Sequence, residues 1–308
     1  MKRFIQPSEL ARDRRFKRAN TRNQLVPSLP NDAEKIADVL EAIGPKIRER
    51  IAGTALEPVY DELGPGFSFL MNAGQPKPGS EHAQQQLKIR LHGIYVGELQ
   101  ALEAAGRTLW DFPDAPWDFK MNMARQCWDE ARHVQTYEKL IERAGGAVGE
   151  YPENTFLFET SCHDDPVLRV TGVNRCLEGL ACDVFRQLID YGVQTGDAVL
   201  AQAVDFVLAD ELTHVRFGSD WVREFTKGDP ARLKRAQDFQ RETDQRFTFG
   251  GARTIARAAA LEAGFTEAEL DEISAMTGPG PSRDTLLRGA EIARDRHLAR
   301  GGKGRATV

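Results

Sequence analysis

The stretch CWDEARHVQTY, residues 127–137, places Glu130 and, one helical turn later, His133 within an apolar helix face. A single Glu-x-x-His pair carries little weight, because the chain has 46 acidic residues and six histidines. The stretch LADELTHVRF, residues 208–217, repeats the pattern with Glu211 and His214, and an Asp again precedes the Glu. The repetition decides how the rest of the chain is interpreted.

Segments of helical period cover most of the chain and strand signals are weak, which predicts an all-α fold. Four long helices are expected at 82–111, 116–144, 166–193 and 197–226. Shorter helices are expected at 31–52, where Asn31 or Asp32 is the cap, and at 229–248, 251–263, 266–276 and 282–299.

The connections between the long helices predict how they pack. Residues 111–116 form a Pro/Asp turn and residues 191–197 a Gly-bounded turn, whereas residues 145–166 form a long crossover. Two helical hairpins that flank one crossover have the connectivity of a ferritin-like four-helix bundle.

Four segments follow from these boundaries: a basic extended arm (1–30), an N-terminal helix with a Gly/Pro-rich loop (31–81), the bundle (82–226) and a C-terminal helical extension (227–308). The loop is expected to be irregular over residues 64–80.

Each hairpin brings two glutamates to the same height. Glu130 lies 16 residues after the turn near residue 114 and Glu98 lies 16 before it, so each is about 24 Å from the bend. Glu211 and Glu178 have the same relation to the turn near residue 194. The offsets from Glu98 to Glu178 (80 residues) and from Glu130 to Glu211 (81 residues) indicate an internal repeat.

Four carboxylates in one apolar core require neutralisation, because each isolated buried charge loses several kcal/mol of solvation. Two divalent cations would balance four glutamates, and His133 and His214 would add one neutral imidazole each. Such mixed ligands suit iron or manganese, with zinc as an alternative. Glu103 is a rival for Glu98, but it lies about 140° from the centre of the apolar stripe.

The set of Glu98, DEARH, Glu178 and DELTH resembles the ferritin-like di-iron carboxylate superfamily, which includes bacterioferritin, rubrerythrin and the small subunit of ribonucleotide reductase. GELQALEAAGRTL and ARQCWDEARH are also similar to a ferritin-like family of undetermined function. The resemblance covers residues 82–226. It implies two iron ions, or manganese or a mixed Fe/Mn pair, bridged by Glu130 and Glu211, and the full ligand set is Glu98, Glu130, His133, Glu178, Glu211 and His214.

The same resemblance implies that an Asp before each bridging glutamate accepts the outer N–H of a histidine. Asp210 is paired with His133 and Asp129 with His214; the alternative is that both are surface carboxylates.

Three inward polar residues are candidates for a catalytic role. Tyr137 lies four residues after His133, at the spacing of the radical tyrosine in the reductase subunit, although a core tyrosine is the alternative. Its counterpart in the second half is Gly218, which predicts a cavity there. Thr171 and Asn174 replace Leu91 and Ile94 of the first half, and helix–helix hydrogen bonding is the alternative to proton handling or substrate orientation.

The predicted function is a di-iron oxidoreductase that activates O2 to hydroxylate, desaturate or N-oxygenate a small organic substrate. The alternatives are a ferroxidase of bacterioferritin type, a non-catalytic role in which the metal pair is a structural staple or a sensor, and a tRNA hydroxylase. The sequence contains no flavin, nicotinamide or iron–sulfur motif, so a separate electron-donor protein or the substrate is expected to supply electrons.

Composition sets the remaining expectations. No apolar leader or membrane span is present and the four cysteines form no C-x-x-C pair, which favours a cytoplasmic protein with reduced thiols. The net charge is -5, but residues 1–30 carry eight Lys/Arg against Glu9 and Asp13. With two aromatic residues in this arm, nucleic-acid binding is not the favoured function. The oligomeric state stays open, with a homodimer as one option.

Overall fold

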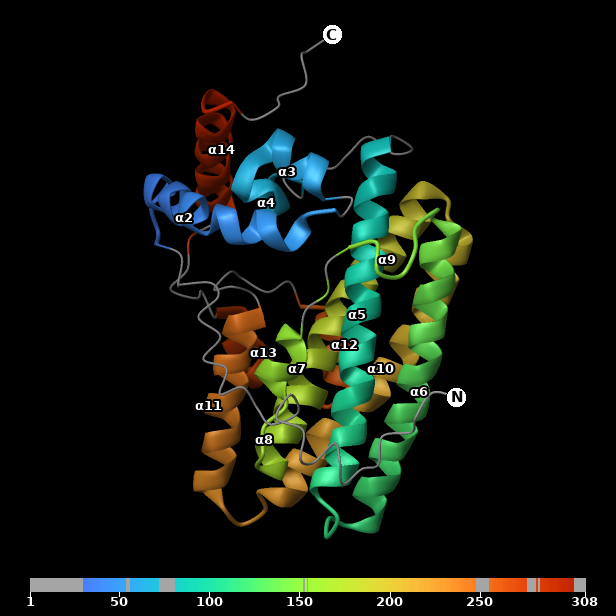
Figure 1. Ribbon diagram of the computed structural model, residues 1–308. Coiled ribbons are helices and arrows are strands. Elements are labelled where there is room, and N and C mark those ends of the chain that lie inside the picture. The colour runs from blue at the N-terminus through green and yellow to red at the C-terminus, as the bar shows by residue number, and fades with distance from the viewer. Residues whose placement is uncertain are drawn as a thin grey trace, which may run out of the picture.

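The computed structural model describes residues 30–53, 56–71, 81–151, 153, 155–247, 255–275, 281 and 283–301. Every regular element within these ranges is a helix, which confirms the all-α prediction (Figure 1). The predicted basic arm (except Pro30), the end of the Gly/Pro-rich loop and the C-terminal tail lie outside the described residues. Among the helices within them, none combines the length and apolarity that a membrane crossing requires.

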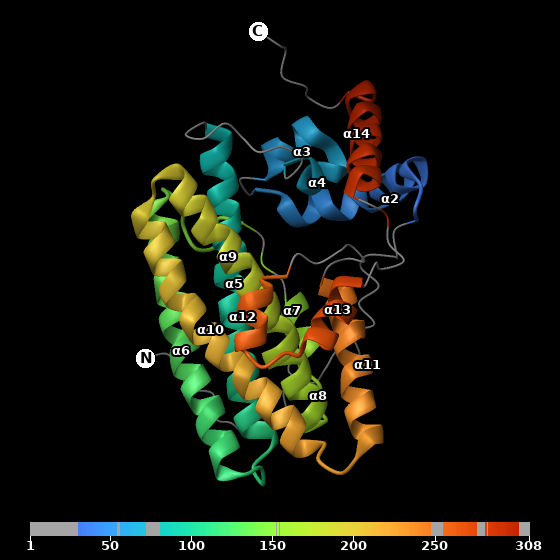
Figure 2. The same ribbon diagram turned by 180° about the vertical axis from the view of Figure 1, so that it is seen from behind.

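Four long helices lie side by side and carry the site: α5 (Glu81–Asp111), α6 (Trp117–Arg143), α9 (Glu178–Thr195) and α10 (Ala198–Phe225) (Figures 1 and 2). α6 starts after Pro116, and α10 starts after Asp197, whose side chain accepts a hydrogen bond from the backbone N–H of Leu200. Gly196, at φ 74°, ends α9. These local signals explain why the predicted boundaries agree with the structure to within a few residues.

The helices pair as the turns predict: α5 packs along α6, and α9 packs along α10. The crossover between the pairs contains the short helix α7 (Phe156–Ser161). A shared core of buried apolar side chains joins both pairs and includes Leu91, Leu188, Val204 and Val207. Each such side chain contributes about 1.5–3 kcal/mol when it leaves water, so the bundle holds its polar cluster inside a rigid apolar frame.

The third long helix is not uniform. The predicted helix over 166–193 consists of α8 (Pro166–Val170), a π-helical turn η2 (Thr171–Leu177) and α9. The backbone N–H of Glu178 donates to Val173 O, five residues earlier. Such π turns are frequent at functional sites, and this one ends directly before Glu178.

Gly218 of α10 allows η2 to approach closely. A Cβ on this residue would lie 2.5 Å from Cβ of Asn174. The predicted cavity at Gly218 is therefore wrong, because Asn174 and Arg175 fill the space that the missing side chain leaves.

Gly218→Ala is expected to destabilise the protein by about 1–3 kcal/mol, because η2 would have to move away from α10. Gly93→Ala is the matched control, since Gly93 is an exposed helical glycine with no atom within 4 Å of an added Cβ. This control should be stabilising by up to about 1 kcal/mol. Chemical denaturation midpoints measure both, and equal midpoints for the two variants would contradict the close packing.

The outer segments pack in two places. α11 (Pro230–Phe247), α12 (Arg257–Glu262) and α13 (Glu267–Ala275) lie against the second helix pair and η2, and Figure 2 shows α12 in front of α9 and α10. α14 (Arg283–Ala299) instead packs on α2 (Ala33–Ile51), far along the sequence. The predicted C-terminal extension 227–308 is thus divided between two neighbourhoods.

The N-terminal helices and α14 form a small lobe near the start of α5 (Figure 1). Ile36, Ala37 and Leu40 pack on Ala290 and Ala293. α3 (Glu57–Leu63), η1 (Gly64–Gly66) and α4 (Phe67–Met71) complete the lobe. Residues 64–71 were predicted to be irregular and are helical instead, because Pro65 lies in a first turn, where it is tolerated, and Phe67 is buried.

Candidate metal centre

Six side chains from four helices meet at mid-height in the bundle. Their exposed fractions are 4% or less, so water reaches none of them freely. They are Glu98 of α5, Glu130 and His133 of α6, Glu178 of α9, and Glu211 and His214 of α10. The structure thus brings together all six residues that the sequence selected.

The six residues form two overlapping groups. One group contains Glu98 and His133, the other contains Glu178 and His214, and both contain Glu130 and Glu211. Within each group, one ligand atom from every residue lies within 4.8 Å of the others. Shared carboxylates between two such groups are the arrangement expected for bridging ligands.

Both histidines turn the same nitrogen toward the centre. Nδ1 of His133 lies 3.1 Å from a Glu130 oxygen, 3.1 Å from a Glu211 oxygen and 3.5 Å from a Glu98 oxygen. Nδ1 of His214 lies 3.1 Å from Glu130 and 3.2 Å from Glu211. The two imidazoles are therefore related by the internal repeat.

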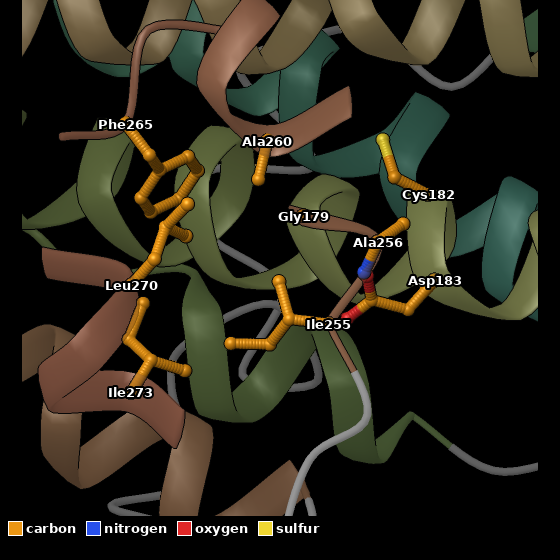
Figure 3. Close-up of a pocket in the computed structure, with 9 residues that line it drawn as sticks. All are labelled: Gly179, Cys182, Asp183, Ile255, Ala256, Ala260, Phe265, Leu270 and Ile273. Atoms are coloured by element: carbon orange, nitrogen blue, oxygen red, sulfur yellow. The ribbon is translucent and has the colours of Figure 1, made fainter. Parts of the chain in front are cut away.

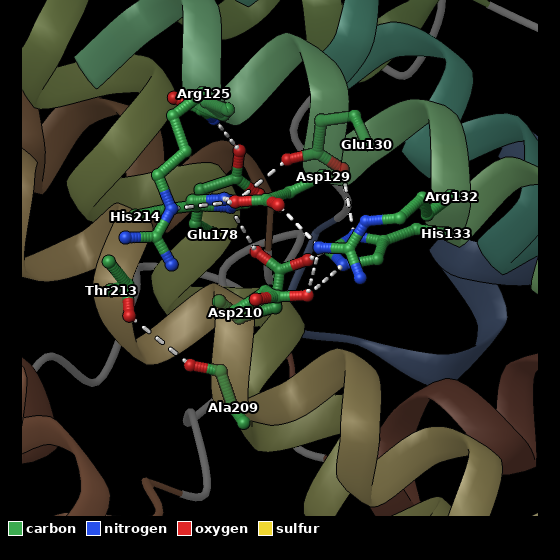
Figure 4. Close-up of polar contacts among 12 residues, drawn as sticks. Arg125, Asp129, Glu130, Arg132, His133, Glu178, Ala209, Asp210, Thr213 and His214 are labelled. Carbon is green, nitrogen blue, oxygen red and sulfur yellow. Dashed lines mark hydrogen bonds and ion pairs between the residues drawn. The ribbon is translucent and has the colours of Figure 1, made fainter. Parts of the chain in front are cut away.

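The outer nitrogens face aspartates in the pairs predicted from the sequence. Nε2 of His133 lies 3.2 Å from Asp210 Oδ2, and Nε2 of His214 lies 3.2 Å from Asp129 Oδ2 (Figure 4). An ionised carboxylate only accepts hydrogen bonds, so each Nε2 carries the ring proton. Nδ1 of each ring is then the atom that faces the carboxylate oxygens.

This arrangement fits cations better than protons. The carboxylates raise the pKa of both imidazoles despite their burial, so in the metal-free protein a proton on each Nδ1 stands where a cation would bind. Within the described residues, Oε1 of Glu130 and Oε1 of Glu211 are buried without a well-aligned hydrogen-bond donor, which is costly in an apolar core. Convergent imidazole nitrogens and carboxylate oxygens are the donors that iron and manganese accept, so these residues fit two divalent ions.

Burial, reinforced by neighbouring carboxylates, raises the pKa of Glu98 and of Glu178 well above the usual range. Burial also opposes ionisation of Glu130, but hydrogen bonds from protonated His133 and His214 lower its pKa, and the carboxylates around each imidazole raise the pKa of both histidines despite their burial. Without cations the cluster therefore retains protons at neutral pH. Cation binding has to displace them.

Gln126 is the first of two polar residues near the cluster that were not selected from the sequence. Nε2 of Gln126 donates to Glu178 Oε1 at 2.5 Å, and Nδ2 of Asn174 donates to Gln126 Oε1 at 2.8 Å. Gln126 lies four residues before Glu130, so its helix position was the only available signal.

Arg132 is the second residue that sequence analysis missed. Its Nη2 donates to Asp210 Oδ2 at 2.9 Å and also to Asp129 Oδ1. Burial alone would raise the pKa of Asp129, but hydrogen bonds from His214 and Arg132 lower it to about 2. The spacing of three residues between Asp129 and Arg132 is the sequence signal for this contact.

The three candidate catalytic residues have different surroundings. Asn174 reaches the cluster through Gln126, and it also donates to the backbone oxygen of His214. Tyr137 is fully buried against Phe185, its hydroxyl has no hydrogen-bond partner in the described residues, and burial raises its pKa. The hydroxyl of Thr171 donates to Val167 O within its own helix, so the structure adds nothing to its catalytic assignment.

A small apolar pocket lies between α9 and the α12–α13 segment (Figure 3). The α9 part follows Glu178 directly, because Gly179 and Cys182 line the pocket. Asp183 accepts a hydrogen bond from the backbone N–H of Ala256 at 2.7 Å, which ties the covering segment to α9. The other lining residues are Ile255, Ala256, Ala260, Phe265, Leu270 and Ile273.

Comparison with known proteins gives one match. A family model described as "Protein of unknown function (DUF455)" matches residues 30–271, which include the whole bundle, α11, α12 and the first part of α13. No curated protein and no solved structure matches the chain.

Proposed function

The chain belongs to the family described as Protein of unknown function (DUF455), and from that premise we propose that it is a dinuclear metal oxidoreductase that uses O2 to oxidise a small organic substrate. We assign the bundle to the ferritin-like fold, because two helix pairs joined by one long crossover carry the cluster.

The observation that carries this proposal is the orientation of the two histidines. Each Nε2 faces an aspartate while each Nδ1 faces at least two glutamate oxygens. A cation between these atoms would replace the proton on each Nδ1 and be coordinated by the nitrogen and the carboxylate oxygens. Glu98 and His133 would hold one ion, Glu178 and His214 the other, and Glu130 and Glu211 would bridge them.

Charge balance favours a pair of divalent ions over a single one. Four glutamates bring four negative charges, and the two histidines are neutral when their protons stay on Nε2. Two divalent ions therefore leave the buried cluster near neutrality, which an apolar core requires. The donor set favours iron or manganese, as in the resemblance drawn from the sequence.

A pair of redox-active ions, when bound, would supply two electrons to O2. The chain contributes the surroundings. The apolar core of the bundle excludes water, Gln126 orients Glu178, and Glu98 and Glu178 release their protons as ions enter.

The pocket beside Glu178 supports an organic substrate over iron alone. Its walls come largely from α12 and α13 and the residues beside them, outside the four-helix bundle, and an iron-storing protein has no use for such a covering segment. The apolar lining of the pocket suits a small apolar molecule, but its volume of about 10 Å³ is that of one water molecule, so the α12–α13 segment would have to move outward to admit a substrate. Electrons for repeated turnover would come from a separate donor protein or from the substrate.

An oxygen electrode tests the proposal. Anaerobically Fe(II)-loaded protein should consume about one O2 per two ions, since two ions supply two electrons. With a chemical reductant present, small apolar compounds should then raise the steady rate of O2 consumption, and Ala260→Val, which adds two methyl groups to the pocket wall, should reduce that increase. If every compound leaves the rate unchanged while added Fe(II) continues to be oxidised, the protein is a ferroxidase instead.

A further inference from the structure

One guanidinium group touches both aspartates that orient the histidines. Nη2 of Arg132 donates to Asp210 Oδ2 at 2.9 Å and to Asp129 Oδ1 (Figure 4). Asp210 in turn lies against His133 and Asp129 against His214. The two halves of the centre are thus linked outside the cluster by a single side chain.

The internal repeat shows that this link is one-sided. The offset of 81 residues places Thr213 at the position equivalent to Arg132. Thr213 donates to Ala209 O of its own helix and cannot provide a cation. Because α10 has no arginine at the position equivalent to Arg132, Arg132 of α6 contacts the aspartates of both halves.

The position of Arg132 is itself fixed. Its guanidinium lies 5.2 Å from the ring centroid of Phe206, a stacking contact that favours arginine over lysine. The side chain is 31% exposed, whereas Asp129 is 4% exposed and Asp210 16%. Arg132 thus closes the centre toward solvent and supplies the positive charge nearest to both aspartates.

Removal of this charge would affect both histidines at once. Asp129 and Asp210 would face each other across the vacated position as two anions, and repulsion would draw them away from the imidazoles. Each ring could then turn or move its proton to Nδ1, which removes the lone pair that faces the centre.

We propose that Arg132 is a positioning residue that clamps Asp129 and Asp210 together, so that His133 and His214 both present Nδ1 to the metal pair. This inference rests on the proposed function, because it assumes ions between the histidines and the glutamates. It adds that the two metal sites share one support and weaken together.

Titration of metal-free full-length protein with Co(II) provides the test. The amount of bound Co(II) and the visible spectrum of the bound ion are measured at each step. Arg132→Ala should weaken both sites by about tenfold, and Asp129→Asn and Asp210→Asn should each weaken mainly one site by about 10- to 100-fold. Arg132→Lys should restore only part of the affinity, since one ammonium lacks the planar fork and the stacking on Phe206.

Arg125→Ala is the matched control. Arg125 is 54% exposed and, of the two aspartates, contacts only Asp129, at 3.3 Å, so its loss should change Co(II) affinity by no more than about threefold. Double-mutant cycles sharpen the contrast: Arg132→Ala should couple to both aspartate variants, and Arg125→Ala only to Asp129→Asn.

The possible outcomes distinguish the failure of the Arg132 clamp from the failure of the proposed metal centre. If wild-type protein binds Co(II) but Arg132→Ala and Arg132→Lys bind it equally well, the clamp is wrong and the metal centre stands. Coupling of Arg132 to only one aspartate also overturns the clamp. If wild-type protein itself retains no metal, the proposed function fails first. Circular dichroism of each variant excludes loss of fold as the cause, and Arg132→Lys provides the result if Arg132→Ala does not fold.

Discussion

Glu211→Gln is expected to remove both metal ions, from about two per chain to almost none. Glu211 belongs to both groups of the cluster and contacts both imidazole nitrogens. A glutamine at this position has one carbonyl oxygen and no charge, so it neither bridges two ions nor balances them. The measurement is metal content after anaerobic loading and gel filtration.

Glu98→Gln is the control for this prediction, because Glu98 belongs to one group only. It should leave about one ion per chain, held by the group of Glu178 and His214. Glu130→Gln should behave like Glu211→Gln. Equal metal loss in Glu98→Gln and Glu211→Gln would contradict the assignment of bridging and terminal carboxylates.

Metal loading is expected to raise the melting temperature of the protein by about 10–20 °C. A ligand at 100 times its Kd stabilises the folded state by about 2.7 kcal/mol per site, and about 1 kcal/mol shifts the melting temperature of a chain of this size by about 2–4 °C. Differential scanning calorimetry with and without Mn(II) measures the shift. A Glu211→Gln protein that gains the same shift would place the stabilising ions elsewhere.

The stability of the metal-free protein should fall as pH rises, whereas its affinity for metal should increase. Burial raises the pKa of Glu98 and Glu178 above the ordinary value of 4.5, so the folded state holds more protons than the unfolded state above that pH. The contribution of these two groups to stability is present in full below pH 4.5 and is lost as pH rises through the folded-state pKa values. Cations displace these protons, so metal affinity rises with pH. Melting temperatures at several pH values check both trends.

The sequence was sufficient to predict the residues of the metal cluster, because helix geometry is regular. Equal distances from a turn placed Glu98 opposite Glu130 and Glu178 opposite Glu211, and the offsets of 80 and 81 residues gave an independent check. The Asp129 and Asp210 contacts came from the resemblance to di-iron proteins, not from geometry, and both are present in the structure.

Other features depend on packing that periodicity does not encode. The π turn η2 moves Asn174 against Gly218 and fills the space where a cavity was expected. Gln126 contacts Glu178 and Arg132 contacts Asp210, each on another helix. The three-residue spacing from Asp129 to Arg132 signals only the contact within α6 and does not reveal the contact with Asp210. The contact between α2 and α14 joins residues more than 240 positions apart, which no local pattern predicts.

The central claim is that two ions occupy the centre, and the most direct measurement is the iron content of protein purified anaerobically, loaded with Fe(II) and freed of excess metal. The account predicts about two iron ions per chain, and about one for Glu178→Ala. Less than one ion per chain in the wild-type protein, or unchanged loading in Glu178→Ala, would contradict it.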